Sequence, residues 1–459
     1  MEILVLNGSP KGDLSVTMQY VAFLAKKNPG HTFPIVNIAQ RINQLETDPV
    51  AFDAVVAQVR KADAVLWAFP VYYMLVHGNF KRFIELVHER GAAPAFGGKY
   101  AASLSTSIRF FDHTAHNYIN AVADDWGMRY HGRYSAKMSD LLDPAERDRL
   151  AAFAAAFLAA AARGLPTARA HQPLVPAGGR YTPGPAAAPV DTGGRKVLLV
   201  TDEGPDDANL AAMTARLAAA FTGPVETVNL RDLDIKGGCL GCCRCAWDNT
   251  CVYDGSDGFT AFYREKVEPA DIVLYAGAVR DRYLSAKWKS YFDRTFFKNH
   301  VPTLSGKQFA FLVSGPLAQL ANLRQILEAY GEFQHTGFLG IVTDEGDPAH
   351  TDALLDRLAA DAVAQASQRY LPPPSFLSVA GGKLFRDEIW SRMRFPFVAD
   401  HKYFKANGLY DFPHRDRADR LRSFLLYWLV HIPAVRKQVY GPQITTHMIA
   451  PLKKLVDSL

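Results

Sequence analysis

Small polar residues and a lysine follow the first apolar run of the chain, and their types suit a phosphate group. Glycine lets the backbone approach an anion closely, hydroxyls donate hydrogen bonds, and the free N–H groups at a helix start point toward the anion. The loop supplies all of these before a helical pattern begins, at Gly8, Ser9, Lys11, Ser15 and Thr17. An ordinary turn followed by a helix-capping serine has a similar composition. The residues favour a monophosphate dianion and leave the plain turn open.

A cluster of thiols provides the second candidate chemistry. All five cysteines lie between Cys239 and Cys251. Four of them, including Cys242 and Cys245, form the spacing C-x2-C-x2-C-x5-C, and Cys243 is surplus. Four thiolates in one short loop can hold an iron–sulfur cube, whereas zinc sites usually separate two Cys-x2-Cys pairs by about a dozen residues or more. The spacing favours a cluster over redox-active or inert thiols, and over zinc.

Two further segments follow predicted strands and could enclose a flat aromatic ring. Aromatic and apolar residues from Pro70 to Met74 end one strand, where they can stack on a ligand. Small polar residues of the segment 103–108, among them Thr106 and Ser107, end the next strand. Ligands of open parallel sheets bind beyond the carboxyl ends of the strands. Both segments and the phosphate loop are therefore expected at one edge of a sheet.

The elements that must position these segments occur twice. Short apolar runs at 4–6, 64–69 and 101–104 alternate with helical patterns, which is typical of a doubly wound parallel sheet. Beyond a stretch rich in Pro, Gly and Ala the pattern restarts, so that residues 197–201 resemble 3–7 and residues 270–276 resemble 62–68. The chain of 459 residues is long enough for two such domains.

At these motifs the chain resembles the NADPH-dependent FMN reductase branch of the flavodoxin-like superfamily. The family's Gly-Ser-x-Arg/Lys and Ser-x-Thr/Asn motifs correspond to residues 8–11 and 15–17, and its Pro-x-Tyr and Lys-x-Phe segments to 70–72 and 81–83. The resemblance implies FMN as the cofactor. The predicted cofactor-binding residues are Ser9, Lys11, Ser15, Val16 and Thr17 for the phosphate, Pro70, Val71, Tyr72, Tyr73 and Met74 for the ring, and Thr106 and Ser107 beside them.

The cysteine loop is similar to that of the iron–sulfur flavoprotein family of the same superfamily. This resemblance implies a [4Fe-4S] cluster, with Cys239, Cys242, Cys245 and Cys251 as metal ligands. Related flavin reductases carry similar cysteines without a cluster, so zinc and free thiols stay open. In the iron–sulfur flavoproteins one domain carries both cofactors, whereas here the two sites fall in different halves.

We predict an α/β protein made of two tandem flavodoxin-like, doubly wound, parallel five-stranded sheets with a mostly helical C-terminal extension. The expected boundaries are 1–165 for the FMN-binding domain, 166–195 for the linker, 196–370 for the second flavodoxin-like domain and 371–459 for the extension. In the extension, the pair Asp400–His401 is expected to serve packing. The apolar stretch 424–430 is expected to pack on the domains or on a dimer mate, with a membrane surface as the alternative.

The second half departs from the flavin pattern at both segments. Asp202 and Glu203 stand where the repeat places Gly8 and Ser9, and Arg280 stands in place of Tyr72. Carboxylates would repel a phosphate at several ångströms. We infer that the second half has lost flavin and that its cysteine loop lies near the flavin of the first half, within the chain or across a dimer.

Composition limits the partners. The net charge is +5, and the residues from Arg386 onward, with 13 basic and 7 acidic side chains, account for it, which does not predict nucleic-acid binding. No apolar run reaches the roughly 18 residues of a membrane span. The amino terminus does not resemble a signal peptide, and the clustered cysteines differ from a secreted disulfide scaffold. We expect a cytoplasmic protein, and a homodimer.

The predicted function is an FMN-dependent oxidoreductase that moves electrons between FMN and a [4Fe-4S] cluster, with NAD(P)H or ferredoxin as the donor. No catalytic acid or base is assigned, because the flavin supplies the chemistry. The alternatives are a cluster-free NAD(P)H-dependent reductase of FMN, quinones or nitro compounds, and an electron carrier without a substrate of its own.

Overall fold

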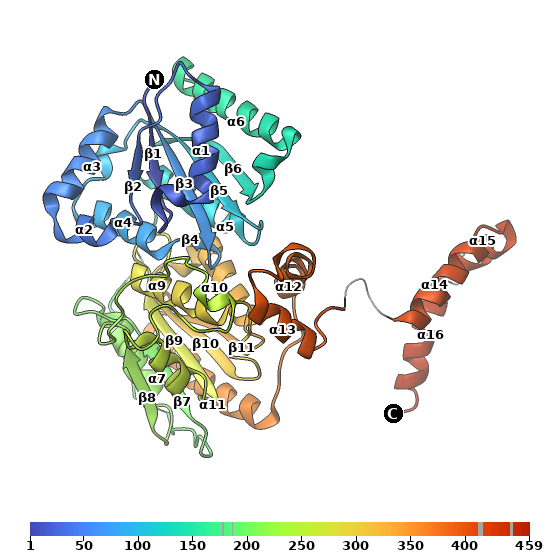
Figure 1. Ribbon diagram of the computed structural model, residues 1–459. Coiled ribbons are helices and arrows are strands. Elements are labelled where there is room, and N and C mark those ends of the chain that lie inside the picture. Colours follow the sequence, from blue (N-terminus) through green and yellow to red (C-terminus); the bar gives the residue numbers. More distant parts are fainter. Residues whose placement is uncertain (177–178, 186, 412–415, 441–443) are drawn as a thin grey trace. The chain divides into compact units, whose positions relative to one another are not determined.

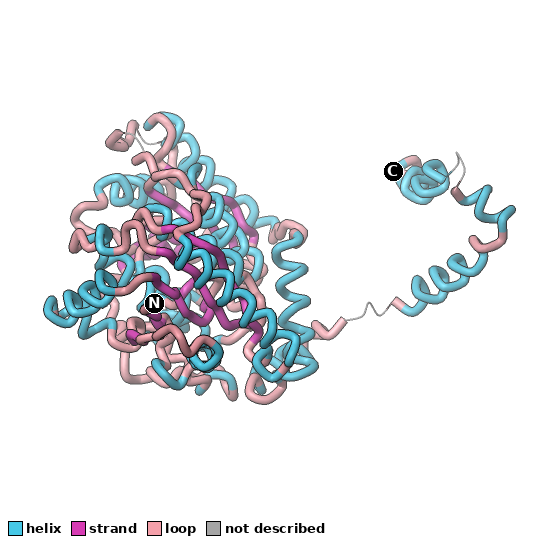
Figure 2. The backbone as a smooth tube through the Cα atoms, turned by 90° about the horizontal axis from the view of Figure 1, so that it is seen from above, coloured by secondary structure: helices cyan, strands magenta, loops and turns pink. Residues whose placement is uncertain are grey.

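The computed structural model describes residues 1–459 except 177–178, 186, 412–415 and 441–443. The chain forms two compact units, Met1–Phe404 and Lys405–Leu459, and each is described by itself. The first unit holds two parallel sheets with helices on both sides of each (Figures 1 and 2).

The sheet of the first half has the strand order β2-β1-β3-β5-β6, and these strands run parallel. Numbered within the half this order is 2-1-3-4-5, the order of a flavodoxin-like sheet. A short strand, β4, pairs antiparallel with the end of β3. The strands are β1 (Ile3–Asn7), β2 (Ile35–Asn37), β3 (Ala64–Tyr72), β4 (Leu75–Val76), β5 (Tyr100–Ser107) and β6 (Arg129–Lys137).

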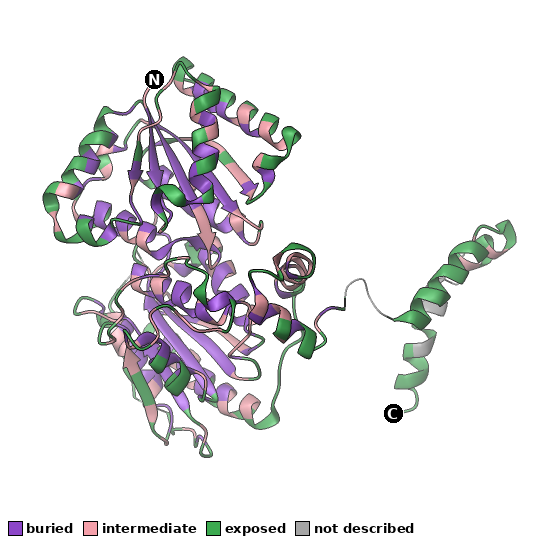
Figure 3. Cartoon of the chain, viewed as in Figure 1, coloured by how far each residue is buried: buried purple, intermediate pink, exposed green. Residues whose placement is uncertain are grey.

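Helices cover both faces of this sheet, which explains why β1 is buried along its whole length (Figure 3). One face packs against α1 and α6, and the other against α3, α4 and α5. The helices are α1 (Val16–Lys27), α2 (Ile42–Thr47), α3 (Pro49–Lys61), α4 (Gly78–Glu89), α5 (Asp112–Asp125) and α6 (Pro144–Arg163).

The second half repeats the same order, since β8-β7-β9-β10-β11 is again 2-1-3-4-5. Its sheet packs against α7 and α11 on one face and against α9 and α10 on the other. The strands are β7 (Val197–Thr201), β8 (Val225–Asn229), β9 (Ile272–Ala278), β10 (Gln308–Ser314) and β11 (Gly337–Thr343). The helices are α7 (Ala208–Ala218), α8 (Phe259–Phe262), α9 (Ala286–Thr295), α10 (Ala321–Phe333) and α11 (Pro348–Gln368). The predicted fold class is thereby confirmed.

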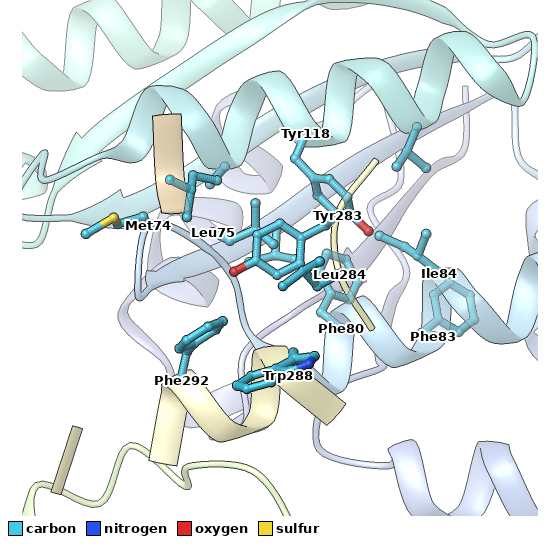
Figure 4. Close-up of a cluster of buried hydrophobic side chains, with 14 of the residues drawn as sticks. Met74, Leu75, Phe80, Phe83, Ile84, Tyr118, Tyr283, Leu284, Trp288 and Phe292 are labelled. Atoms are coloured by element: carbon cyan, nitrogen blue, oxygen red, sulfur yellow. The ribbon is translucent and has the colours of Figure 1, made fainter. Parts of the chain in front are cut away.

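The two halves join through equivalent helices, α4 with α9 and α5 with α10. Gly78 N–H donates to Asp293 Oδ2 and Ala286 N–H donates to Glu85 Oε1, both at 2.7 Å. Gly78 matches Ala286, and Glu85 matches Asp293, at the 208-residue offset of the sequence repeat, so the contact is reciprocal. One hydrophobic core crosses this junction and includes Phe80, Phe83, Ile84, Tyr118, Tyr283, Leu284, Trp288 and Phe292 (Figure 4).

The C-terminal region begins with α12 (Phe376–Glu388) and α13 (Val398–Ala406). Both helices contact the second half, α12 through α10 and α13 through Asp400. The Phe385 ring lies 3.9 Å from the His300 ring, and buried Asp400 accepts the His300 N–H at 3.1 Å, as the packing interpretation of this carboxylate predicted. The second unit contains α14 (Arg417–Leu429), α15 (Pro433–Val439) and α16 (Ile444–Val456). No residue of α14 is buried within its own unit, and packing of 424–430 on the domains or on a dimer mate stays a prediction. None of the helices in the described parts of the chain is long and apolar enough to cross a membrane.

Candidate flavin site

The loop between β1 and α1 is shaped by the side chain of Asn7. Its Nδ2 donates to Asn37 Oδ1 at 2.8 Å, and its Oδ1 accepts the N–H of Ser9 at 3.0 Å. These bonds tie the loop to the carboxyl ends of β1 and β2, beside the point where the strand order reverses. Such a switch point is where ligands of open α/β sheets bind.

Two buried hydroxyls of this loop retain protons for an anion. Ser9 Oγ accepts the Lys11 N–H at 3.2 Å, and Ser15 Oγ caps α1 by accepting the Met18 N–H at 3.3 Å. A hydroxyl that accepts a backbone N–H still has its own proton to donate. The first N–H groups of α1, from Val16 onward, have no partner within the helix. The donor set thus fits a phosphate, and exposed Lys11 adds positive charge.

The predicted segment 103–108, called the third segment below, adjoins the phosphate loop. Thr17 Oγ1 and Thr106 Oγ1 form a buried hydrogen bond of 2.6 Å between α1 and β5. Ser107 follows at the end of β5, where its Oγ accepts the Arg109 N–H at 2.8 Å. The structure therefore brings together two segments that lie about ninety residues apart in the sequence.

The ring segment forms a tight hairpin between β3 and β4. Pro70, Val71 and Tyr72 complete β3, and Tyr73 and Met74 make the turn at φ 37° and 63°. Side chains other than glycine, asparagine and aspartate rarely adopt such angles, and backbone strain of this kind concentrates at functional sites.

The side chains of the two turn residues pack within the protein, with Tyr73 partly and Met74 fully buried. The Tyr73 ring packs 6.3 Å from the rings of Phe296 and Tyr330 in the second half. Met74 is buried, and its carbonyl accepts the Thr114 hydroxyl at 2.5 Å. Tyr73 therefore contacts the second half and Met74 is bonded within the first half, and their place at the flavin ring stays a prediction.

His77, which was not singled out from the sequence, connects the hairpin to the second half. Its Nδ1 accepts the Asn79 N–H at 3.1 Å, so its Nε2 carries the proton and donates to the Cys239 carbonyl at 2.7 Å. Burial lowers the pKa of His77, which favours this neutral imidazole. The Tyr72 ring meets the His77 ring edge-on at 4.9 Å. The sequence signal was the position just before a helix, where His77 caps α4.

The cysteine loop of the second half lies directly on these groups. A β-carbon at Gly238 would come within 2.9 Å of Asn79 Oδ1 and 3.1 Å of His77 Cε1. A β-carbon at Gly241, whose φ is 63°, would overlap Tyr72 Oη and approach Lys11 Cε to 3.0 Å. The predicted closeness of the cysteine loop to the flavin segments of the other half is thus observed within one chain. Burial and the nearby Cys239 and Asp293 raise the pKa of Tyr72 well above its usual value.

The thiols do not converge as cluster ligands do. Cys239 Sγ accepts the Gly241 N–H at 3.4 Å, whereas Cys245 Sγ faces the Phe296 carbonyl at 3.5 Å. Cys242 is exposed, and no three metal-binding side chains among the described residues are arranged to hold an ion. Burial, with the neighbouring Cys242, raises the pKa of Cys245 to about 12. The described residues therefore give the predicted [4Fe-4S] cluster no support beyond the cysteine spacing.

In the second half, the loop after β7 carries charged side chains that bond with groups of the same half. Arg280 Nη2 pairs with Asp207 Oδ2 at 2.5 Å, and Asp207 also accepts the Gly204 N–H at 2.7 Å. Asp202 is buried and accepts a hydrogen bond from Ser285. Burial raises the pKa of Asp202 to about 6. Carboxylates and an arginine thus stand at positions that match the predicted flavin segments of the first half, and the loss of flavin from this half stays a prediction.

Comparison with known proteins finds a matching family for part of the first half. Residues 1–120 match the family of NADPH-dependent FMN reductases. The matched stretch includes the phosphate loop, the ring hairpin and the third segment, which confirms the resemblance drawn from the motifs. No curated protein matches the chain.

Three solved structures illustrate the similarity. FerB, a flavoenzyme NAD(P)H:(acceptor) oxidoreductase from Paracoccus denitrificans, is 20% identical with a TM-score of 0.31, over 35% of this chain and 97% of that chain. General stress protein 14 from Treponema denticola, in complex with FMN, is 15% identical with a TM-score of 0.27, over 35% and 98%. An FMN-dependent NADH-azoreductase from Bacillus anthracis is 14% identical with a TM-score of 0.27, also over 35% and 98%.

Proposed function

We propose that the first half binds FMN and that the protein is an NAD(P)H-dependent flavin oxidoreductase. The observation that carries the proposal is the donor set at the start of α1, where Ser9 and Ser15 keep hydroxyl protons beside free helix N–H groups. Lys11 and the hydrogen bond between Thr17 and Thr106 complete the phosphate side. FMN, when bound, supplies the electron-transfer chemistry, and the chain supplies binding and orientation.

On the ring side, the backbone of 70–74 has the main role. The strained hairpin presents peptide groups near the carboxyl end of β3. The Tyr72 ring lies against the His77 ring, and Tyr72 and Lys11 both lie against Gly241. Small-molecule acceptors such as quinones, nitro compounds or free flavin would take electrons here. Ferredoxin as donor and a pure electron carrier are the alternatives.

The test is reconstitution. Purified protein titrated with FMN should quench flavin fluorescence at one site per chain, and NADPH should bleach the bound flavin. Binding without bleaching by NADPH or NADH would favour the electron carrier, and the absence of binding would contradict the proposal. Light scattering on the same sample tests the predicted homodimer.

Only the cysteine spacing supports a [4Fe-4S] cluster, and the function proposed here does not require one. Anaerobic purification followed by iron and sulfide analysis decides between the two. About four irons and four sulfides per chain would establish the cluster, and their absence beside stoichiometric FMN would leave the flavin as the redox centre.

A further inference from the structure

The turn Gly238–Gly241 touches residues of the first half that belong to the predicted FMN site. The Cys239 carbonyl accepts from His77 Nε2 at 2.7 Å, and Gly241 lies against Tyr72 Oη and Lys11 Cε. These contacts use carbonyl and glycine atoms, so the loop's position does not depend on any thiol being a ligand.

The same loop exposes thiols to solvent. Cys242 and Cys243 follow the turn directly and are exposed, and Cys243 has a left-handed backbone with φ 57°. The other end of the loop is fixed, because Asn299 Nδ2 donates to the Cys245 carbonyl at 2.9 Å. A bulky group on Cys242 or Cys243 therefore acts on a short segment held between His77 and Asn299.

We propose that this cysteine turn is a wall of the first half's flavin site, contributed by the second half, so that FMN occupancy and the chemical state of Cys242 and Cys243 are coupled. The inference rests on FMN binding as proposed above. Coupling is reciprocal in free energy: if modification of the thiols weakens FMN binding, bound FMN disfavours the modified state to the same extent. Bound FMN that holds the turn should also slow modification, which is a rate effect and need not have the same size. Soft electrophiles and oxidants that modify thiols are the chemical class to which such a site responds.

The experiment measures alkylation of Cys242 and Cys243 by N-ethylmaleimide in the full-length protein, with and without saturating FMN, by peptide mass spectrometry. FMN is expected to slow both rates at least about threefold, and alkylated protein is expected to bind FMN more weakly than unmodified protein. Equal rates in the presence and absence of bound FMN overturn the inference while leaving the proposed function intact. If FMN does not bind at all, both fail, and fluorescence quenching identifies that case.

Two adjacent glycines supply a matched pair of variants. Gly238→Ala adds a methyl against Asn79 and His77, whereas Gly237→Ala adds one at an ordinary 3.5 Å from Tyr253 Oη. We expect Gly238→Ala to weaken FMN about tenfold and to abolish the protection of the thiols, and Gly237→Ala to behave as wild type. Equal FMN affinity and equal protection of the thiols in the two variants would contradict the proposal that this turn forms a wall of the flavin site. The wild-type labelling decides the question even if Gly238→Ala fails to fold.

Discussion

The loops after β1 and after β7 occupy the same place in two sheets of the same strand order, yet their chemistry is opposite. The first offers hydroxyl protons, helix N–H groups and a lysine; the second holds Asp202, Glu203 and Asp207, with Arg280 paired to Asp207. A shared fold therefore places a ligand-binding edge in both halves, and a few side chains decide whether an anion can enter. The following predictions test that contrast, beginning with the contact that joins the halves.

The largest effect is expected at the reciprocal junction. Lys289 pairs with Asp293, its one carboxylate partner among the described ion pairs, and both are fully buried, whereas Lys81 pairs with both Glu85 and Asp281. Asp293→Ala leaves a buried lysine unpaired, which costs about 3–5 kcal/mol. Glu85→Ala should cost less, because Lys81 keeps Asp281 at 3.0 Å. Urea unfolding midpoints compare the two variants; equal losses would show that the junction is energetically symmetric.

The second prediction concerns the phosphate loop: a carboxylate at position 9 should give the first half the acidic character of the second half's loop and weaken FMN binding. Ser9→Asp places a negative charge beside the FMN phosphate at about 4 Å, which should weaken binding about 100-fold. Ser9→Ala, which removes only the hydroxyl, should weaken it about tenfold. Fluorescence titration measures both. Glu203→Ser, the opposite change in the second half, serves as the control and should leave the affinity unchanged.

Buried Asp202 in the second half should make the stability of the fold fall as pH rises, the opposite of what most acidic side chains do. The pKa of Asp202 is about 6 in the folded chain against 3.8 as the reference value. Between about pH 4 and 6 the unfolded chain releases this proton while the folded chain keeps it, so stability falls as pH rises, by about 2–3 kcal/mol in total. Asp202→Asn should abolish that loss. The difference in unfolding midpoint between wild type and variant should grow from pH 4 to pH 7; a constant difference would contradict the assignment.

The smallest effect concerns the bond between the phosphate loop and the third segment. Thr17→Val leaves the buried Thr106 hydroxyl without its partner and should cost about 1–2 kcal/mol of stability, with FMN binding weakened a few-fold. Gln19→Ala on the exposed side of the same helix is the control. Thermal unfolding and FMN titration of the two variants provide the measurement, and a Thr17→Val protein indistinguishable from the control would remove this bond from the site.

The sequence predicts the sheets because their central strands are apolar runs, as at Val197–Thr201, where helices cover both faces. It does not reveal β6, an edge strand of mostly polar, half-buried residues, because no apolar run marks it. The phosphate loop is local and was therefore predictable, and the repeat indicated where the second half departs from it. The contacts of His77 with Cys239 and of Tyr72 with Gly241 depend on how two distant helices pair, which no local pattern specifies.

The reciprocal contact between α4 and α9 has a consequence for how such a chain can diverge. In an assembly of two identical subunits, every substitution appears on both sides of the junction, so a residue that benefits one site must be tolerated in the other. Fusion of the two copies into one polypeptide removes that constraint. One copy can then lose its ligand and become scaffold, acquire a cysteine insertion, and act on its neighbour's site, while the stoichiometry of the pair stays fixed at one to one by the covalent chain.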